Sequence, residues 1–170
     1  KDFDFFGPYP RIQPEAAADY LAAQGVQYEL ETLTNICAIG HVSRVKVDFV
    51  RSLYDWLEPP DMLGQYSCAI ATMSDLMAMK LAAVAGRGVW KDFVDIYAIA
   101  ISEEIDVYRA IDLYKRLHGL DSSAHLVTSL TYFDDAEASE WPRMRWKVPR
   151  SQIKQFFRVW ARDVAGRGHP

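Results

Sequence analysis

SDLMAMKLAAVAGRGVWKDFVDIY, which spans residues 74–97, holds much of the information that the sequence gives about the fold. Between Leu76 and Ala85 every residue except Lys80 is apolar, a pattern typical of a buried helix. Burying a lysine ammonium without a partner is costly, because the charge loses its hydration. Lys80 therefore either extends its ammonium along its own stem to solvent or meets an anion from another part of the chain.

Two helices are expected in this stretch, separated by a pair of glycines. We expect the first to run from about residue 72 to 85 and to end at Gly86, and the second to span about 89–101. Thr72 and Asp75 have the spacing of a capping box, with Asp in the place of Glu or Gln.

Charged residues follow the glycines at helical spacing. If they share one helix, Arg87, Lys91 and Asp95 form a stripe at four-residue steps, opposite an apolar face. The stripe is either a solvated surface with a Lys91–Asp95 pair or part of a binding site. Arg87 lies between two glycines, whose freedom allows the backbone to bring it close to a ligand.

The remaining sequence divides into strands followed by helices. Alternation and turn residues predict strands at about 2–6, 26–39, 43–52 and 65–71, with Gly40 in a hairpin connection and a helix within 14–25. Further helices are expected after Ser102 and after Asp121, and a last one around 153–160. This order predicts an α+β fold, with a sheet region at 1–71 and a helical region at 72–170 that we expect to pack as one compact domain.

Composition bounds the class of protein. The 170 residues carry a formal net charge of −4 and are 50% hydrophobic, which is ordinary for a globular chain and lacks the overall basic character of a dedicated nucleic-acid binder. We find no segment apolar enough to span a membrane and no phosphate loop or zinc spacing. Cys37 and Cys68 are expected to be reduced residues of a cytoplasmic protein.

Three aspartates fall on the polar faces of expected strands, at positions 2, 4 and 48. Aspartate is depleted from strands, and for any one of these residues a solvent-facing edge is a sufficient explanation. Together, Asp2, Asp4 and Asp48 suggest a patch whose mutual repulsion a divalent cation would relieve. Carboxylate oxygens suit Mg²⁺ or Mn²⁺, which would also bridge substrate phosphates.

Four segments occur in an order that resembles the AbiEii/AbiGii-type nucleotidyltransferase family, whose members include toxins of abortive-infection and toxin–antitoxin systems. The segments are KDFDFFG at 1–7, GHVSRVKVDFVR at 40–51, the stretch at 74–97 and SLTYFDDAE at 129–137. The resemblance implies a polymerase-β-like nucleotidyltransferase fold, a short mixed sheet followed by a helical region. It covers most of the chain.

The resemblance also implies roles for individual residues. By similarity, Asp2 and Asp4 are the D-x-D metal pair and Asp48 is the third carboxylate, placed to accept the proton of the attacking hydroxyl. The lysine that meets the triphosphate in the family corresponds to Lys80. The family's Arg…Lys-Asp motif is matched by Arg87, Lys91 and Asp92, of which Arg87 and Lys91 would help to neutralise the leaving pyrophosphate. Without nucleotide, we expect Lys80 to pair with one of the strand carboxylates.

Family members carry a Gly-Ser or Gly-Gly-Thr turn shortly before the D-x-D, and we expect that this chain lacks it. Two functions follow. The first is metal-dependent transfer of a nucleoside monophosphate from an NTP to an RNA or protein acceptor, with a toxin-like role in phage defence or a toxin–antitoxin system and an antitoxin partner. The alternative is a truncated, non-catalytic relative that acts as a binding or interaction module, whose exposed apolar surface a second copy would cover.

Overall fold

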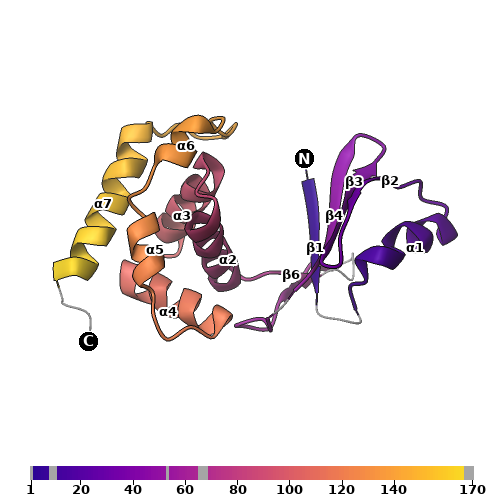
Figure 1. Ribbon diagram of the computed structural model, residues 1–170, viewed down its shortest axis with the longest axis horizontal. Helices are drawn as coiled ribbons and strands as arrows, with labels where there is room; N and C mark the ends of the chain where they lie inside the picture. The colour runs from indigo at the N-terminus through magenta and orange to yellow at the C-terminus, as the bar shows by residue number, and fades with distance from the viewer. Residues whose placement is uncertain (1, 8–10, 53, 65–68, 167–170) are drawn as a thin grey trace. The chain divides into compact units, whose positions relative to one another are not determined.

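The computed structural model describes residues 2–7, 11–52, 54–64 and 69–166, and its contacts divide the chain into two compact units. Unit 1 is Lys1–Asp55 and unit 2 is Trp56–Pro170 (Figure 1). Cys68 and most of the strand expected at 65–71 lie outside the described residues. None of the helices that the structure describes has the length and apolar content that a membrane span requires.

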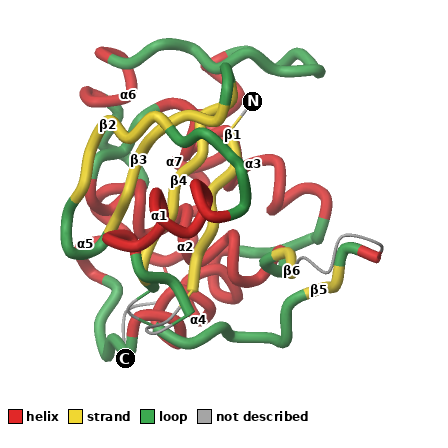
Figure 2. Tube along the Cα trace, turned by 90° about the vertical axis from the view of Figure 1, so that its right-hand side faces the viewer, coloured by secondary structure: helices red, strands yellow, loops and turns green. Residues whose placement is uncertain are grey.

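Unit 1 is a four-stranded mixed sheet with one helical segment. Its strands are β1 (Asp2–Gly7), β2 (Glu29–Leu33), β3 (Cys37–Val42) and β4 (Val45–Arg51), in the spatial order β1-β4-β3-β2. β1 runs parallel to β4, whereas the other neighbours are antiparallel. The short 3-10 helix η1 (Pro14–Ala16) leads into α1 (Ala17–Ala23), which crosses one face of the sheet (Figure 2).

One sheet face forms the core of unit 1. Ala38 is fully buried there, and the Tyr28 hydroxyl donates a 3.0 Å hydrogen bond to the Val47 carbonyl. Gly40 lies inside β3, and not in the hairpin connection where we expected it. A Cβ at that position would approach Tyr28 Cζ to 2.7 Å, which accounts for the glycine. The turn between β3 and β4 contains Ser43 instead, at a φ of 59°.

Unit 2 contains a small two-stranded sheet and six helices among its described residues. The strands are β5 (Asp61–Met62) and β6 (Ala69–Ile70), and the helices are α2 (Met73–Gly86), α3 (Trp90–Ser102), α4 (Val107–His118), α5 (Ala124–Ser129), α6 (Asp134–Ala138) and α7 (Arg150–Gly166). The sheet of unit 1 followed by these helices confirms the predicted α+β fold.

The helix starts show which capping predictions were right. The Thr72 hydroxyl accepts the Asp75 N–H at 3.2 Å and donates to the same residue's carboxylate at 2.6 Å, so the predicted N-cap is confirmed. The cap expected at Ser102 was wrong, because α3 continues through that residue and Asp106 caps α4 by accepting the Arg109 N–H at 2.8 Å. α5 begins after Ser123 and not after Asp121.

The core of unit 2 is aromatic. Trp90, Phe93 and Phe157 are fully buried, and the ring centroids of Phe93 and Phe157 lie 5.0 Å apart in a T-shaped contact that joins α3 to α7. Large rings of this kind dominate core energetics through the apolar area that they bury. The core therefore fixes α3, which carries several of the charged residues described below.

Candidate functional site

The three strand aspartates lie on one face of the unit 1 sheet. Asp4 is paired with Asp48 in the parallel register of β1 and β4, and Asp2 is paired with Lys46. Paired residues of neighbouring strands point to the same side, and residues two apart along a strand share that side. The register therefore gathers Asp2, Asp4 and Asp48, opposite the face on which Phe5 stacks against Phe49.

Lys46 supplies the positive charge of this face. Its ammonium lies 2.5 Å from Asp48 Oδ2, and this hydrogen bond is the main reason that the pKa of Lys46 is raised. Burial works in the opposite direction, and the fields of Asp48, Asp4 and Asp2 raise the pKa further. Lys46 was not among the residues that we predicted for the site, although its position two residues before Asp48 in a strand indicates that the two side chains share a face.

The chemistry of this acidic face suits a hard divalent cation. Asp48 is only 8% exposed, and its Oδ1 atom is buried without a hydrogen-bond partner in the described part of the chain. A bound cation would stabilise such an oxygen, because it would replace the water contacts that burial removed. Within the residues that the structure describes, no three His, Cys, Asp or Glu side chains already stand at metal-binding geometry, and Lys46 is the cation that now contacts Asp48.

A second charged cluster lies in unit 2, where α2 and α3 pack together. Lys80, on α2, has its Nζ 2.6 Å from Asp95 Oδ2 and 3.6 Å from Asp92 Oδ1. Both acids belong to α3, so Lys80 meets an anion from another element, as one of the two sequence alternatives proposed. The partners differ from the strand carboxylates that we expected.

Asp92 is the buried centre of this cluster. It is fully buried and accepts two hydrogen bonds from Arg87, at 3.0 Å from Nε and 3.1 Å from Nη2. The bond to Asp92 is the main reason that the pKa of Arg87 is raised. A paired guanidinium of this kind satisfies both carboxylate oxygens at once, which explains how a charged group is tolerated in the core.

The stripe expected on one helix was wrong for Arg87, which is the C-cap residue of α2 and not part of α3. Lys91 and Asp95 do lie on α3, but Asp95 contacts Lys80, and Lys91 is exposed in the first turn. Lys80 is 28% exposed and Arg87 is 57% exposed. Lys80, Arg87 and Lys91 thus all reach solvent. Ion pairs with the acids of α3 hold Lys80 and Arg87 in place.

Comparison with known proteins adds an independent finding. A family model described as "Nucleotidyl transferase AbiEii toxin, Type IV TA system" matches residues 4–165. A curated relative, "Uncharacterized protein aq_aa25" of Aquifex aeolicus (strain VF5), is 26% identical over an aligned length of 163 residues, and the alignment covers 92% of this chain and 75% of the relative. No solved structure matches the chain significantly.

Proposed function

The chain belongs to the AbiEii nucleotidyltransferase toxin family of type IV toxin–antitoxin systems, and from this premise we propose that it transfers a nucleoside monophosphate from an NTP to a hydroxyl group of an RNA or protein acceptor. The observation that carries the proposal is the parallel register that pairs Asp4 with Asp48 and places Asp2 on the same face. Nucleotidyl transfer needs grouped carboxylates of this kind to hold the divalent cations that neutralise the phosphate charge.

The acidic face of unit 1 has two proposed roles. Asp2, Asp4 and Asp48 would hold Mg²⁺ or Mn²⁺, which supplies positive charge against the phosphate oxygens. Asp48 has the one carboxylate oxygen that is buried and without a hydrogen-bond partner among the described residues. This oxygen is our candidate for accepting the proton of the acceptor hydroxyl.

The charged cluster of unit 2 would bind the triphosphate. Lys80 and Arg87 neutralise Asp92 but also reach solvent, and Lys91 is exposed, so all three can donate to phosphate oxygens, which are strong acceptors. Asp92 is proposed to orient Lys80 and Arg87, since it contacts both from a fully buried position. Asp95 is more exposed than Asp92, so a phosphate group can replace it at Lys80 at a smaller cost in desolvation.

In the proposed reaction the acceptor oxygen forms a bond to the α-phosphorus of the NTP, and the bond from that phosphorus to the pyrophosphate oxygen breaks. The hydroxyl proton passes to Asp48. The pyrophosphate leaves with the bonding electron pair, and its charge must be neutralised by cations.

The family description supports a toxin role and implies an antitoxin partner. We propose that the protein acts in the cytoplasm, where NTPs and RNA acceptors are available, and that its physiological role is phage defence. Both statements rest on the family and on the proposed reaction.

Transfer of label from an NTP labelled at the α-phosphate to total RNA, or to protein, tests the proposal. Asp48→Asn is expected to lower the transfer rate by about 100-fold or more, because it removes a metal ligand and the proton acceptor. Lys80→Met is expected to weaken NTP binding by about 10-fold or more, because a charge-assisted hydrogen bond is lost.

A thermal-shift titration with MnCl₂ provides a second measurement, since binding to the folded state raises the melting temperature. The shift should disappear in Asp48→Asn and persist in Asp112→Asn, a matched control at an exposed aspartate of α4. Equal shifts in both variants would place the metal elsewhere. Binding of NTP without transfer to any acceptor would favour the non-catalytic binding module.

A further inference from the structure

A basic and aromatic segment joins α6 to α7 and has no role in the proposed reaction. Its sequence is WPRMRWKVPR, residues 141–150, and it holds four basic residues and no acid in a chain whose net charge is −4. We call it the basic–aromatic loop. Such a local excess of positive charge requires an explanation that the average composition does not supply.

The charges at the centre of the loop are available to a partner. Arg143, Arg145 and Lys147 are exposed, and none of them forms an ion pair with another residue that the structure describes. Arg150 differs, because it lies 3.2 Å from Glu137 and its guanidinium covers the ring of Trp141. The loop therefore presents three cations to solvent and uses the fourth to fix its own end.

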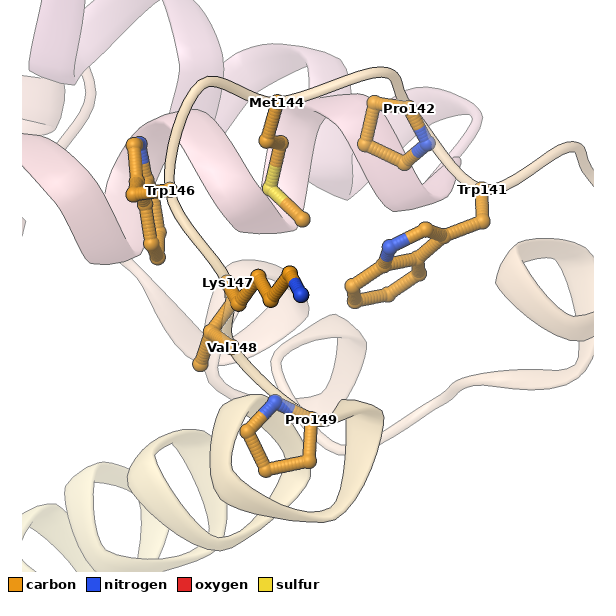
Figure 3. Close-up of a pocket in the computed structure, with 7 residues that line it drawn as sticks. All are labelled: Trp141, Pro142, Met144, Trp146, Lys147, Val148 and Pro149. Atoms are coloured by element: carbon orange, nitrogen blue, oxygen red, sulfur yellow. The ribbon is translucent and has the colours of Figure 1, made fainter.

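The loop also lines an open pocket of about 380 Å³. Figure 3 shows the rings of Trp141 and Trp146 on opposite sides of this pocket, with the Lys147 side chain extending between them. Met144 and three further residues complete the apolar lining: Pro142, Val148 and Pro149. The pocket thus combines two aromatic rings with one ammonium group.

The rings are held in place before any ligand arrives. Trp146 is 41% exposed, yet its ring stacks on Tyr97 with centroids 6.1 Å apart. Tyr97 is itself fixed, because its hydroxyl accepts a 2.6 Å hydrogen bond from Gln152 Nε2. Trp141 packs edge-on against the buried Trp90 at 5.0 Å. A pre-positioned ring loses little conformational entropy when a ligand stacks on it.

We propose that the basic–aromatic loop binds single-stranded nucleic acid, with a base inserted beside Trp146 and phosphates on Arg143, Arg145 and Lys147. Unpaired bases offer flat faces to stack on indole rings, and the adjoining phosphates match cations that have no carboxylate partner. A duplex buries its base faces in its own stack. An acidic peptide would neutralise the cations but would leave the two indole rings of the pocket without a function.

This inference rests on the proposed function. It deepens that function by naming single-stranded RNA, and not protein, as the acceptor class. Its binding chemistry needs neither NTP nor metal, so it is measured separately. A labelled single-stranded RNA of about 12 nucleotides, long enough to cover a site of this class, is titrated against the full chain by fluorescence anisotropy without NTP or divalent cations.

The test variant is Arg143→Gln/Arg145→Gln. We expect its affinity to fall by about 10-fold or more and its salt dependence to weaken, because fewer phosphate contacts release fewer counterions. The matched control is Arg109→Gln/Arg116→Gln, which makes the same change in net charge on α4, where both arginines contact Asp112. The control is expected to bind within about twofold of wild type.

Stacking is tested at Trp146. Trp146→Phe keeps an aromatic face and is expected to bind within about threefold of wild type, whereas Trp146→Leu keeps apolar bulk and is expected to lose about 10-fold. Circular dichroism and melting temperature verify that both variants are folded.

Three results would overturn the proposal: equal RNA affinity in the loop and control double variants, equal affinity for duplex and single strand, or a poly-glutamate peptide that binds the loop as tightly as RNA. Failure of the proposed function looks different. In that case no label is transferred, but RNA binding remains, with the same dependence on Arg143, Arg145 and Trp146.

Discussion

Asp92 illustrates how a single residue can organise a charged cluster. Its carboxylate is fully buried, contacts Arg87 through two hydrogen bonds and lies 3.6 Å from Lys80. A buried charge is tolerated only where its partners replace the lost hydration. The two cations therefore serve the fold as well as any substrate, and removing their common partner affects both.

Asp92→Asn is expected to lower the free energy of unfolding by about 1.5–3 kcal/mol, because it weakens the charged hydrogen bonds that a fully buried carboxylate accepts from Arg87 and removes its attraction to Lys80. Asp95→Asn is the control, since Asp95 is 44% exposed and contributes about 0–1 kcal/mol through its pair with Lys80. Urea denaturation of both variants measures the difference. Equal losses would show that burial of Asp92 is not what determines its contribution.

At the scale of the element, α4 ends at a titratable residue. His118 is the last residue of the helix, and Gly119 follows in the left-handed conformation at a φ of 61°. Burial lowers the pKa of His118 below its ordinary value of 6.5, although a backbone hydrogen bond that involves Ala78 acts in the opposite direction. The neutral imidazole is therefore the form that suits the packing of α4.

The sign of the pH dependence follows from this depressed pKa. Stability from neutral His118 is fully present above about pH 6.5 and is lost as the pH falls through the lower folded-state pKa, because protons then bind the unfolded chain more tightly. As the pH falls below about 6.5, His118→Gln should lose less stability than wild type. Urea denaturation across this range measures the slopes, and parallel slopes would contradict the prediction.

At the scale of the whole molecule, contacts fall into two sets, residues 1–55 and residues 56–170. Each set has its own buried centre, with Ala38 and Val47 in unit 1 and the aromatic cluster of Phe93 and Phe157 in unit 2. Regions with separate cores commonly open as separate cooperative units. The chain is expected to behave in this way.

Phe93→Ala should cost about 3–5 kcal/mol, because it leaves a cavity in a fully buried aromatic cluster. Amide hydrogen exchange should accelerate in α2, α3 and α7 while β3 and β4 keep their wild-type protection. Val47→Ala provides the reciprocal variant in unit 1. Equal acceleration across both units in either variant would show that they unfold as one.

Local patterns in the sequence determined the strand-then-helix order, the cap at Thr72 and the sharing of one face by Asp2, Asp4 and Asp48. These features depend on residues that are two apart in a strand or three apart at a helix start. Such short spacings can be read directly from the sequence. The order of motifs likewise indicated the family that the comparison confirmed. The metal and phosphate roles of these residues stay predictions.

Only the tertiary structure decided which charges meet. Lys80 has no acid one turn away on its own helix, and its partners Asp92 and Asp95 become neighbours because α2 packs against α3. Gly40 pairs with Val47 inside β3, at a position where the Tyr28 ring leaves no room for a side chain. Contacts between elements depend on how the elements pack against one another. That packing results from the burial of apolar faces that belong to several elements, so no single stretch of sequence determines it.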